Sequence, residues 1–156
     1  MSSTIEIKNL HRRYKIDERL VKRIASLILK YCKKPSGVNF EIVFLTDREI
    51  RRLNKKFKGS DRATDVLSFD LGGSVFGAGP FLGEAFISID RALENSKVFN
   101  AKFEEEVTLY IIHAILHLFG YDDETLKERA RMERKQKKIL RFLCKRENLS
   151  KVLMPR

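Results

Sequence analysis

Cysteine is scarce in this chain: its 156 residues include two, Cys32 and Cys144, which lie far apart. Neither belongs to a C-x-x-C pair, so the sequence offers no redox motif and no disulfide framework. Both fall within helical patterns of apolar residues. We therefore expect two buried free thiols in a protein of a reducing compartment.

Long apolar runs are missing as well. The longest, residues 107–119, is too short to span a bilayer and contains two histidines. The amino-terminal stretch lacks the apolar core of a signal peptide. We therefore expect a cytoplasmic protein with no membrane association.

Acidic side chains are outnumbered, and the formal net charge is +11. Residues 1–62 carry seventeen basic and seven acidic side chains, and residues 127–156 carry twelve and three, whereas residues 63–126 are net acidic. Basic ends around an acidic centre fit a polyanionic partner such as nucleic acid. Solvated helix faces and membrane contact are the alternative interpretations.

Repeats and low-complexity linkers are absent, and 43% of the residues are hydrophobic, which predicts one domain over residues 1–156. Apolar periodicity predicts a sheet of about four strands with helices packed around it. The expected strands are residues 4–10, 38–45, 66–71 and 81–89. The expected helices are residues 17–33, a helix opening at the capping box of residues 46–49, and residues 90–99, 104–119 and 124–147.

Two details of this pattern concern surfaces. In the helix that opens at Thr46, Ile50, Leu53 and Phe57 recur at helical spacing, so we expect them to face the core. Residues 72–80 are rich in glycine but lack the spacing of a phosphate-binding loop. We interpret them as a mobile flap near a cleft.

One short segment, H-A-I-L-H-L-F-G-Y-D-D, predicts a metal site. An α-helix turns once in about 3.6 residues, so His113 and His117 project from one face. Gly120 suits the left-handed position that ends a helix and turns the chain so that Asp123 can face both histidines. Three protein ligands with a fourth position for water are typical of catalytic zinc.

The same residues have other interpretations. A lone histidine in an apolar helix is usually a core residue, although burying two imidazoles without a strong partner is costly. Asp122 or Asp123 can instead cap the following helix, and Thr125 with Glu128 forms a rival capping box.

Three segments together resemble the YbeY endoribonucleases, the bacterial rRNA maturation factors. The metal segment is similar to that family's H-G-x-L-H-L-x-G-Y-D-H, and L-N-K-K-F-K-G-S-D-R-A-T-D-V-L-S-F at residues 53–69 is similar to its L-N-x-x-Y-R-x-x-d-x-P-T-D-V-L-S-F. Between them, L-G-E-A-F-I-S at residues 82–88 resembles its L-G-D-I-x-I-S strand. The resemblance implies an α+β fold, with a single mixed sheet of about four strands, surrounding helices and a central buried metal-bearing helix.

The resemblance also implies a function: a zinc-dependent endoribonuclease that cuts single-stranded RNA in ribosomal RNA maturation, at the 3′ end of small-subunit rRNA, and in ribosome quality control. The expected cofactor is one zinc ion, or another transition metal, per chain. The expected partners are ribosomal RNA, the small ribosomal subunit and its assembly factors. The implied catalytic cations are Lys58 and Arg62, and Thr64 and Ser68 are the implied substrate contacts; all four also suit an ordinary loop and strand surface.

This sequence departs from the family pattern at two functional positions. Asp123 replaces the third histidine, which keeps a zinc ligand but adds negative charge that makes bound water less acidic. Lys58 replaces an arginine, which keeps the charge but loses the planar fork that suits phosphate. Both changes bear on rate and metal preference.

Two other classes fit part of the pattern. Metzincin proteases share the H-x-x-x-H-x-x-G-x-x-D spacing, but they carry a glutamate general base where this chain has Ala114. A nonenzymatic RNA-binding ribosome assembly factor with a structural metal is the third class. It would keep its function after loss of the metal ligands.

Overall fold

The computed structural model describes residues 3–34, 37–70 and 81–156 of the chain. Within these residues, four strands form the main sheet, in the order β1-β3-β5-β4, and two short strands form a second sheet. The strands are β1 (Thr4–Asn9), β2 (Tyr14–Ile16), β3 (Asn39–Leu45), β4 (Val66–Asp70), β5 (Phe81–Ser88) and β6 (Leu153–Pro155). The helices are α1 (Glu18–Tyr31), α2 (Asp47–Lys58), α3 (Ile89–Val98), α4 (Phe103–Leu118), α5 (Leu126–Cys144) and the 3-10 helix η1 (Leu149–Lys151).

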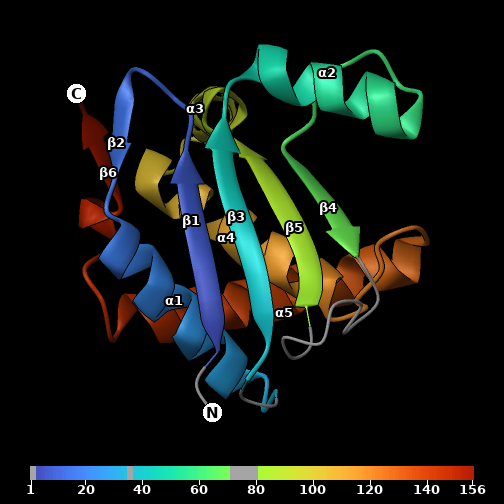
Figure 1. Ribbon diagram of the computed structural model, residues 1–156. Coiled ribbons are helices and arrows are strands. Elements are labelled where there is room, and N and C mark those ends of the chain that lie inside the picture. Colours follow the sequence, from blue (N-terminus) through green and yellow to red (C-terminus); the bar gives the residue numbers. More distant parts are fainter. Residues whose placement is uncertain (1–2, 35–36, 71–80) are drawn as a thin grey trace.

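The main sheet is mixed. Strands β1, β3 and β5 are parallel, and β4 pairs antiparallel with β5 at one edge. Helices α1, α4 and α5 lie together on one face of this sheet (Figure 1). The α+β fold expected from the resemblance is therefore confirmed.

Helix α4 is the central element of the large core. Ile111, Ile112 and Ile115 are among its fully buried side chains, and they pack with the apolar faces of α1 and of the sheet. A helix that is apolar on nearly all sides is stable only when other elements surround it. The helix that carries both candidate histidines is thus held rigidly between the sheet and α5.

A second, smaller core lies on the opposite face of the sheet, under α2. Val43, Leu45, Ile50 and Leu67 form it. Phe57, expected to face this core, is instead 57% exposed at the end of α2. Helical spacing alone does not set how far a core extends, and the buried part of this core ends before the last turn of α2.

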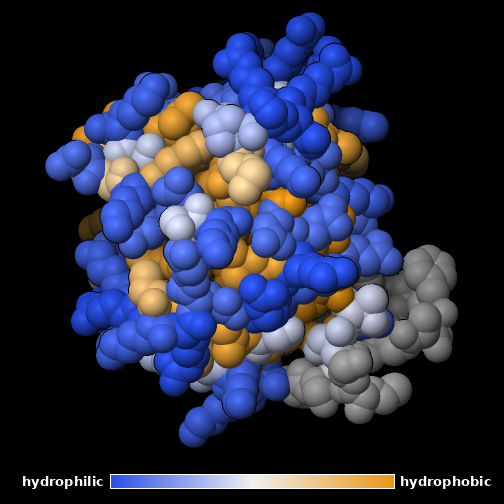
Figure 2. Space-filling model, turned by 90° about the vertical axis from the view of Figure 1, so that its left-hand side faces the viewer, coloured by the Kyte–Doolittle hydropathy of each residue, from blue (hydrophilic) through white to orange (hydrophobic). Residues whose placement is uncertain are grey.

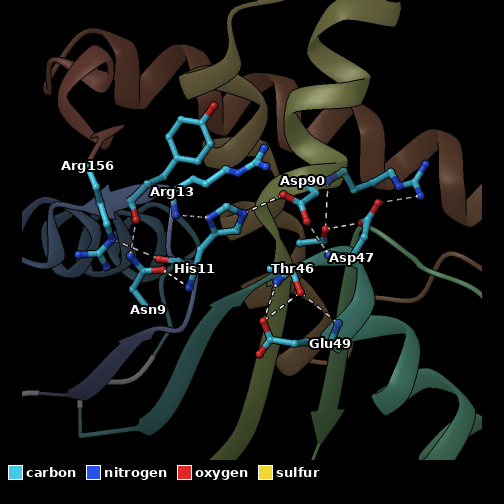
Figure 3. A network of polar contacts seen from close by, with 11 residues as sticks. Asn9, His11, Arg13, Thr46, Asp47, Glu49, Asp90 and Arg156 are labelled. Carbon is cyan, nitrogen blue, oxygen red and sulfur yellow. Dashed lines mark hydrogen bonds and ion pairs between the residues drawn. The ribbon is translucent and has the colours of Figure 1, made fainter.

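A polar network ties together the carboxyl ends of the three parallel strands (Figure 3). Buried His11, just after β1, lies 2.7 Å from Asp90 at the start of α3. The other carboxylate oxygen of Asp90 accepts the backbone N–H of Asp47, which follows β3, at 2.9 Å. The loops after β1, β3 and β5 are therefore cross-linked away from the candidate histidines of α4.

Most expected elements are present within a few residues of their predicted bounds. The last helix is shorter than expected, because Thr125 caps α5 and the helix ends at Cys144. Cys144 is exposed and Cys32 is half-buried, so the expectation of two buried thiols was wrong. The predicted flap at residues 72–80 lies outside the described residues.

The short strands β2 and β6 were not expected from the sequence. They pair antiparallel and join the amino-terminal part of the chain to its carboxyl end. Figure 2 shows the molecule from the left-hand side of Figure 1, and hydrophilic side chains cover most of that surface. None of the described helices is both long and apolar enough to cross a bilayer.

Candidate metal centre

Local geometry at the end of α4 brings three candidate ligands together. His113 and His117 lie one turn apart, with ring centroids separated by 4.5 Å. Gly120 has a φ of 89°, the left-handed conformation expected for it, and its N–H bonds to the carbonyl of His117. The chain turns back there, so Asp123 lies beside both rings.

The distances between the ligand atoms suit a tetrahedral metal. The Nε2 atoms of His113 and His117 are 2.9 Å apart, and Asp123 Oδ2 is 3.5 Å and 3.4 Å from them. Ligands at the usual zinc bond length lie roughly 3.3 Å from one another in a tetrahedron. Two imidazoles and a carboxylate are also a donor set typical of zinc and neighbouring transition metals. The residues present therefore fit one such ion.

This group lines an open cleft. The side chains of His113 and His117 are 21% and 23% exposed, and that of Asp123 is 38% exposed. A fourth coordination position can therefore face solvent or substrate, as a catalytic site requires. The cleft is lined by Lys58, Thr64, Asp65, Val66, Leu67, Ser68, His113, His117, Gly120, Asp122, Asp123 and Glu124.

The protonation state of His117 favours metal binding. Burial lowers the pKa of its imidazole, and the His113 ring adds to this effect, while the Asp123 and Asp122 carboxylates oppose it. A metal binds the neutral imidazole. His117 is therefore ready to act as a ligand at neutral pH.

Gln136 orients the other imidazole. Its side-chain oxygen lies 2.7 Å from His113 Nδ1 and accepts the proton there, which leaves the Nε2 lone pair directed toward His117 and Asp123. Such partners of the second ring nitrogen fix the tautomer of metal-binding histidines. We did not expect this residue from the sequence, because Gln136 lies 23 positions away on α5, amid charged residues.

Asp123 does not cap the helix that follows it. The N-cap of α5 is Thr125, which forms a capping box with Glu128. The sequence left two caps open, an aspartate or the Thr125–Glu128 capping box, and the structure has the capping box. The Asp123 carboxylate is thus free to face the histidines.

The remaining predicted site residues divide between two hollows. Lys58, Thr64 and Ser68 line the cleft of the metal ligands. Arg62 lines an adjoining hollow and its Nε donates to Ser60 Oγ at 3.1 Å. The structure therefore brings Lys58 to the metal ligands and places Arg62 beside a separate surface.

The position of Lys58 follows from the end of α2. Gly59, with a φ of 71°, ends this helix in the left-handed conformation, and its N–H bonds to the carbonyl of Asn54. Asn54 is buried and donates to the carbonyl of Arg62 at 2.9 Å, which holds the loop that follows. Strand β4 then places Ser68 against α4, with its hydroxyl 3.5 Å from the carbonyl of Ala114.

In this α+β fold, two side chains from the central helix and one from the loop that follows it converge at an open cleft, and together they could hold a metal ion in an arrangement typical of catalytic sites. The sequence model described as endoribonuclease YbeY matches residues 5–144. The chain belongs to this family, as the resemblance of its three motifs predicted.

Individual relatives agree with this assignment. The chain is 37% identical over 136 residues to endoribonuclease YbeY of Clostridioides difficile (strain 630), covering 82% of this chain and 88% of that protein. It is 34% identical over 146 residues to endoribonuclease YbeY of Thermoanaerobacter sp. (strain X514), covering 83% and 92%. The solution structure of TM1509 from Thermotoga maritima aligns with a TM-score of 0.61 and 32% identity, covering 88% of this chain and 87% of that one.

Proposed function

We propose that this protein is a zinc-dependent endoribonuclease that cuts single-stranded RNA, with residues 1–156 acting as one domain. The observation that carries the proposal is the converging His113, His117 and Asp123 triangle in a cleft that Lys58 also lines. Membership of a family named for endoribonuclease activity supports it. The net charge of +11 supports a polyanionic substrate.

The chemistry divides between the metal and the surrounding side chains. A zinc ion, or another transition metal, held by the three ligands supplies Lewis acidity and lowers the pKa of water. Lys58 stabilises the negative charge that develops on the phosphoryl oxygens during cleavage. Ser68 and Thr64 contact the substrate at the cleft wall, and Arg62 contacts a phosphate in the adjoining hollow.

The cellular role follows the family resemblance. We propose that the substrate is ribosomal RNA, cut at the 3′ end of small-subunit rRNA during maturation and in ribosome quality control. The protein would act in the cytoplasm, bound to the small ribosomal subunit and its assembly factors. The excess of basic side chains at both ends of the chain supports contact with such a polyanionic particle.

The peptidase alternative has no support at the position where its general base would be. Ala114, directly after the first histidine ligand, is fully buried and has no ionisable group. A metallopeptidase of this spacing uses a glutamate there. The protein therefore has no side chain at that position that could accept a proton during peptide hydrolysis.

The direct experiment is cleavage of a defined, unstructured RNA by the zinc-loaded protein. We expect cutting by the wild type, no cutting by His113→Ala, and a large loss of rate in Lys58→Ala with zinc retained. Lys58→Arg should remain active, because arginine keeps the charge and adds a bidentate fork. Peptide hydrolysis with intact RNA would contradict the proposal, as would binding of RNA and of small-subunit precursor particles without cleavage.

A further inference from the structure

Three phenylalanines form a continuous aromatic ridge on the side of β4 opposite α4. Phe57 comes from the last turn of α2, Phe69 from β4 and Phe86 from β5. The ring centroids of Phe57 and Phe69 are 5.5 Å apart, and those of Phe69 and Phe86 are 5.7 Å apart, both in edge-to-face arrangements. Side chains alternate along a strand, so Phe69 and the neighbouring Ser68 face opposite sides of the sheet.

This ridge is open to solvent. Phe57 is 57% exposed, although Phe69 and Phe86 pack against the small core under α2. A shallow apolar hollow is lined by Phe57, Phe69, Phe86 and one acid, Glu84. An exposed aromatic side chain at the mouth of an apolar hollow suits a partner that offers a flat apolar surface.

Two lysines give the ridge a positive charge. Lys56 Nζ lies 5.2 Å from the centroid of the Phe57 ring, and Lys58 Nζ lies 5.6 Å from that of Phe69. Glu84 is the opposing charge at the hollow. Aromatic faces beside lysines are the combination with which proteins bind single-stranded nucleic acid, because the rings stack with bases and the cations neutralise phosphates.

The ridge is continuous with the metal cleft. Lys58 lines that cleft and also stands over the Phe69 ring, so it borders both surfaces. Strand β4 is the edge of the sheet, and no further strand of the described residues separates its two sides. One strand of RNA can therefore pass the edge with its backbone at Lys58 and reach both places.

We propose that the aromatic ridge of Phe57, Phe69 and Phe86 binds an unpaired base of the RNA whose backbone lies in the metal cleft, with Phe57 as the stacking surface. This inference rests on the proposed function and deepens it, because stacking on Phe57 would make the protein select single-stranded RNA over duplex RNA. A base within a duplex is stacked on its neighbours and paired, so its face is unavailable to Phe57. RNA held only by Lys58 and other cations would be bound through phosphates alone, and its bases would not need to be unpaired.

The first test measures binding and cleavage of a short single-stranded RNA that contains 2-aminopurine, whose fluorescence falls on stacking. In Phe57→Leu, which keeps an apolar side chain, we expect roughly a tenfold or greater rise in Kd and KM, and kcat unchanged. Phe57→Tyr should behave as the wild type. Phe99→Leu is the matched control, since Phe99 is 70% exposed at the end of α3.

The second test adds a reporter. The chain has no tryptophan, so Phe57→Trp introduces a single indole at the ridge. We expect its fluorescence to be quenched by single-stranded RNA and unchanged by duplex RNA at the same concentration. Thermal unfolding of each variant confirms that an altered Kd comes from a folded protein.

The outcomes separate this inference from the proposed function. Cleavage by the wild type with equal Kd and KM in Phe57→Leu, or equal quenching by duplex and single strand, overturns the ridge and leaves the nuclease intact. Quenching by single-stranded RNA without any cleavage by the wild type overturns the nuclease and supports the ridge. If Phe57→Leu weakens binding to a protein partner and leaves RNA binding unchanged, this result also overturns the ridge.

Discussion

Two clusters in this molecule pair histidine with aspartate, and they have opposite character. In the first, buried His11 receives the backbone N–H of Arg13 at Nδ1 and lies 2.7 Å from Asp90 through Nε2. Both ring nitrogens are used, and the side chain is 3% exposed. This cluster is a closed cross-link between loops, with no lone pair left for a metal.

In the second cluster, the ring nitrogens of two histidines converge instead of pairing separately. Gln136 takes the Nδ1 proton of His113, so the Nε2 lone pair faces His117 and Asp123. The cluster opens into a cleft rather than into the core. A histidine near a carboxylate is therefore not a metal site in itself; the direction of the free lone pairs makes it one.

The largest effect that should separate the clusters is metal content. We expect about one zinc ion per chain in the wild type and nearly none in His117→Ala, because a ligand is lost. His11→Ala should retain full zinc but lower the free energy of unfolding by about 1–3 kcal/mol, since Asp90 loses its histidine partner and keeps only the Asp47 N–H. Elemental analysis and denaturant unfolding measure the two effects. Full zinc in His117→Ala would remove the difference between the clusters.

Asp123 and Asp90 should differ in their effect on zinc affinity, as the histidines of the two clusters do. Asp123→Asn removes charge from the site and should weaken zinc affinity by more than the roughly 10–100-fold that the loss of an outer partner costs. Asp123→His should bind zinc well, as a three-histidine site. Asp90→Asn is the control, and its zinc affinity should equal that of the wild type in a competition titration with a chelator. An unchanged affinity in Asp123→Asn would show that this carboxylate is not a ligand.

Gln136 gives a smaller effect of the same kind. Gln136→Leu removes the acceptor for His113 Nδ1 and should weaken zinc affinity by roughly 10–100-fold, while Gln136→Glu should keep it. Lys137→Leu is the matched control, on the same helix with an exposed side chain. The chelator titration again measures the result. Equal affinities in the two leucine variants would mean that Gln136 does not orient His113.

The smallest effect concerns a carboxylate that belongs to neither cluster. Burial raises the pKa of Glu106, a hydrogen bond with Tyr110 opposes the rise, and the Asp65 carboxylate adds to it. The folded state thus binds more protons than the unfolded state, so the free energy of unfolding falls as pH rises from the unfolded pKa through the folded one. Glu106→Gln should remove this dependence and raise the free energy of unfolding at neutral pH relative to the wild type.

Denaturant unfolding at a series of pH values between roughly 4 and 8 checks this expectation, since the unperturbed glutamate pKa lies near the lower limit. Glu104→Gln is the control, because Glu104 shares the acidic first turn of α4 and so tests the lost interaction with the helix dipole. A stability difference between wild type and Glu106→Gln that stays constant with pH would contradict the assignment.

The grouping of the three candidate metal ligands was predictable because their arrangement is local. Spacing along one helix brings His113 and His117 together, and a left-handed glycine returns the chain to Asp123 within a few residues. The start of α2 was predictable for the same reason, since this helix opens at a capping box in the sequence, whereas the Thr125 capping box of α5 was one of two alternatives. The outward position of Phe57 and the exposure of Cys144 were not, because burial depends on how far the neighbouring elements reach.

The sequence by itself determined the family, the strand and helix pattern, and three ligand types at a spacing that suits a metal. Only the tertiary structure decided which residues from elsewhere lie beside them: it adds Gln136 from α5, and of the two expected cations it brings Lys58 into the cleft and leaves Arg62 in a separate hollow. The reason is physical. Contacts within one helical turn follow from backbone geometry, whereas contacts between elements depend on the packing of α4 against α5 and β4.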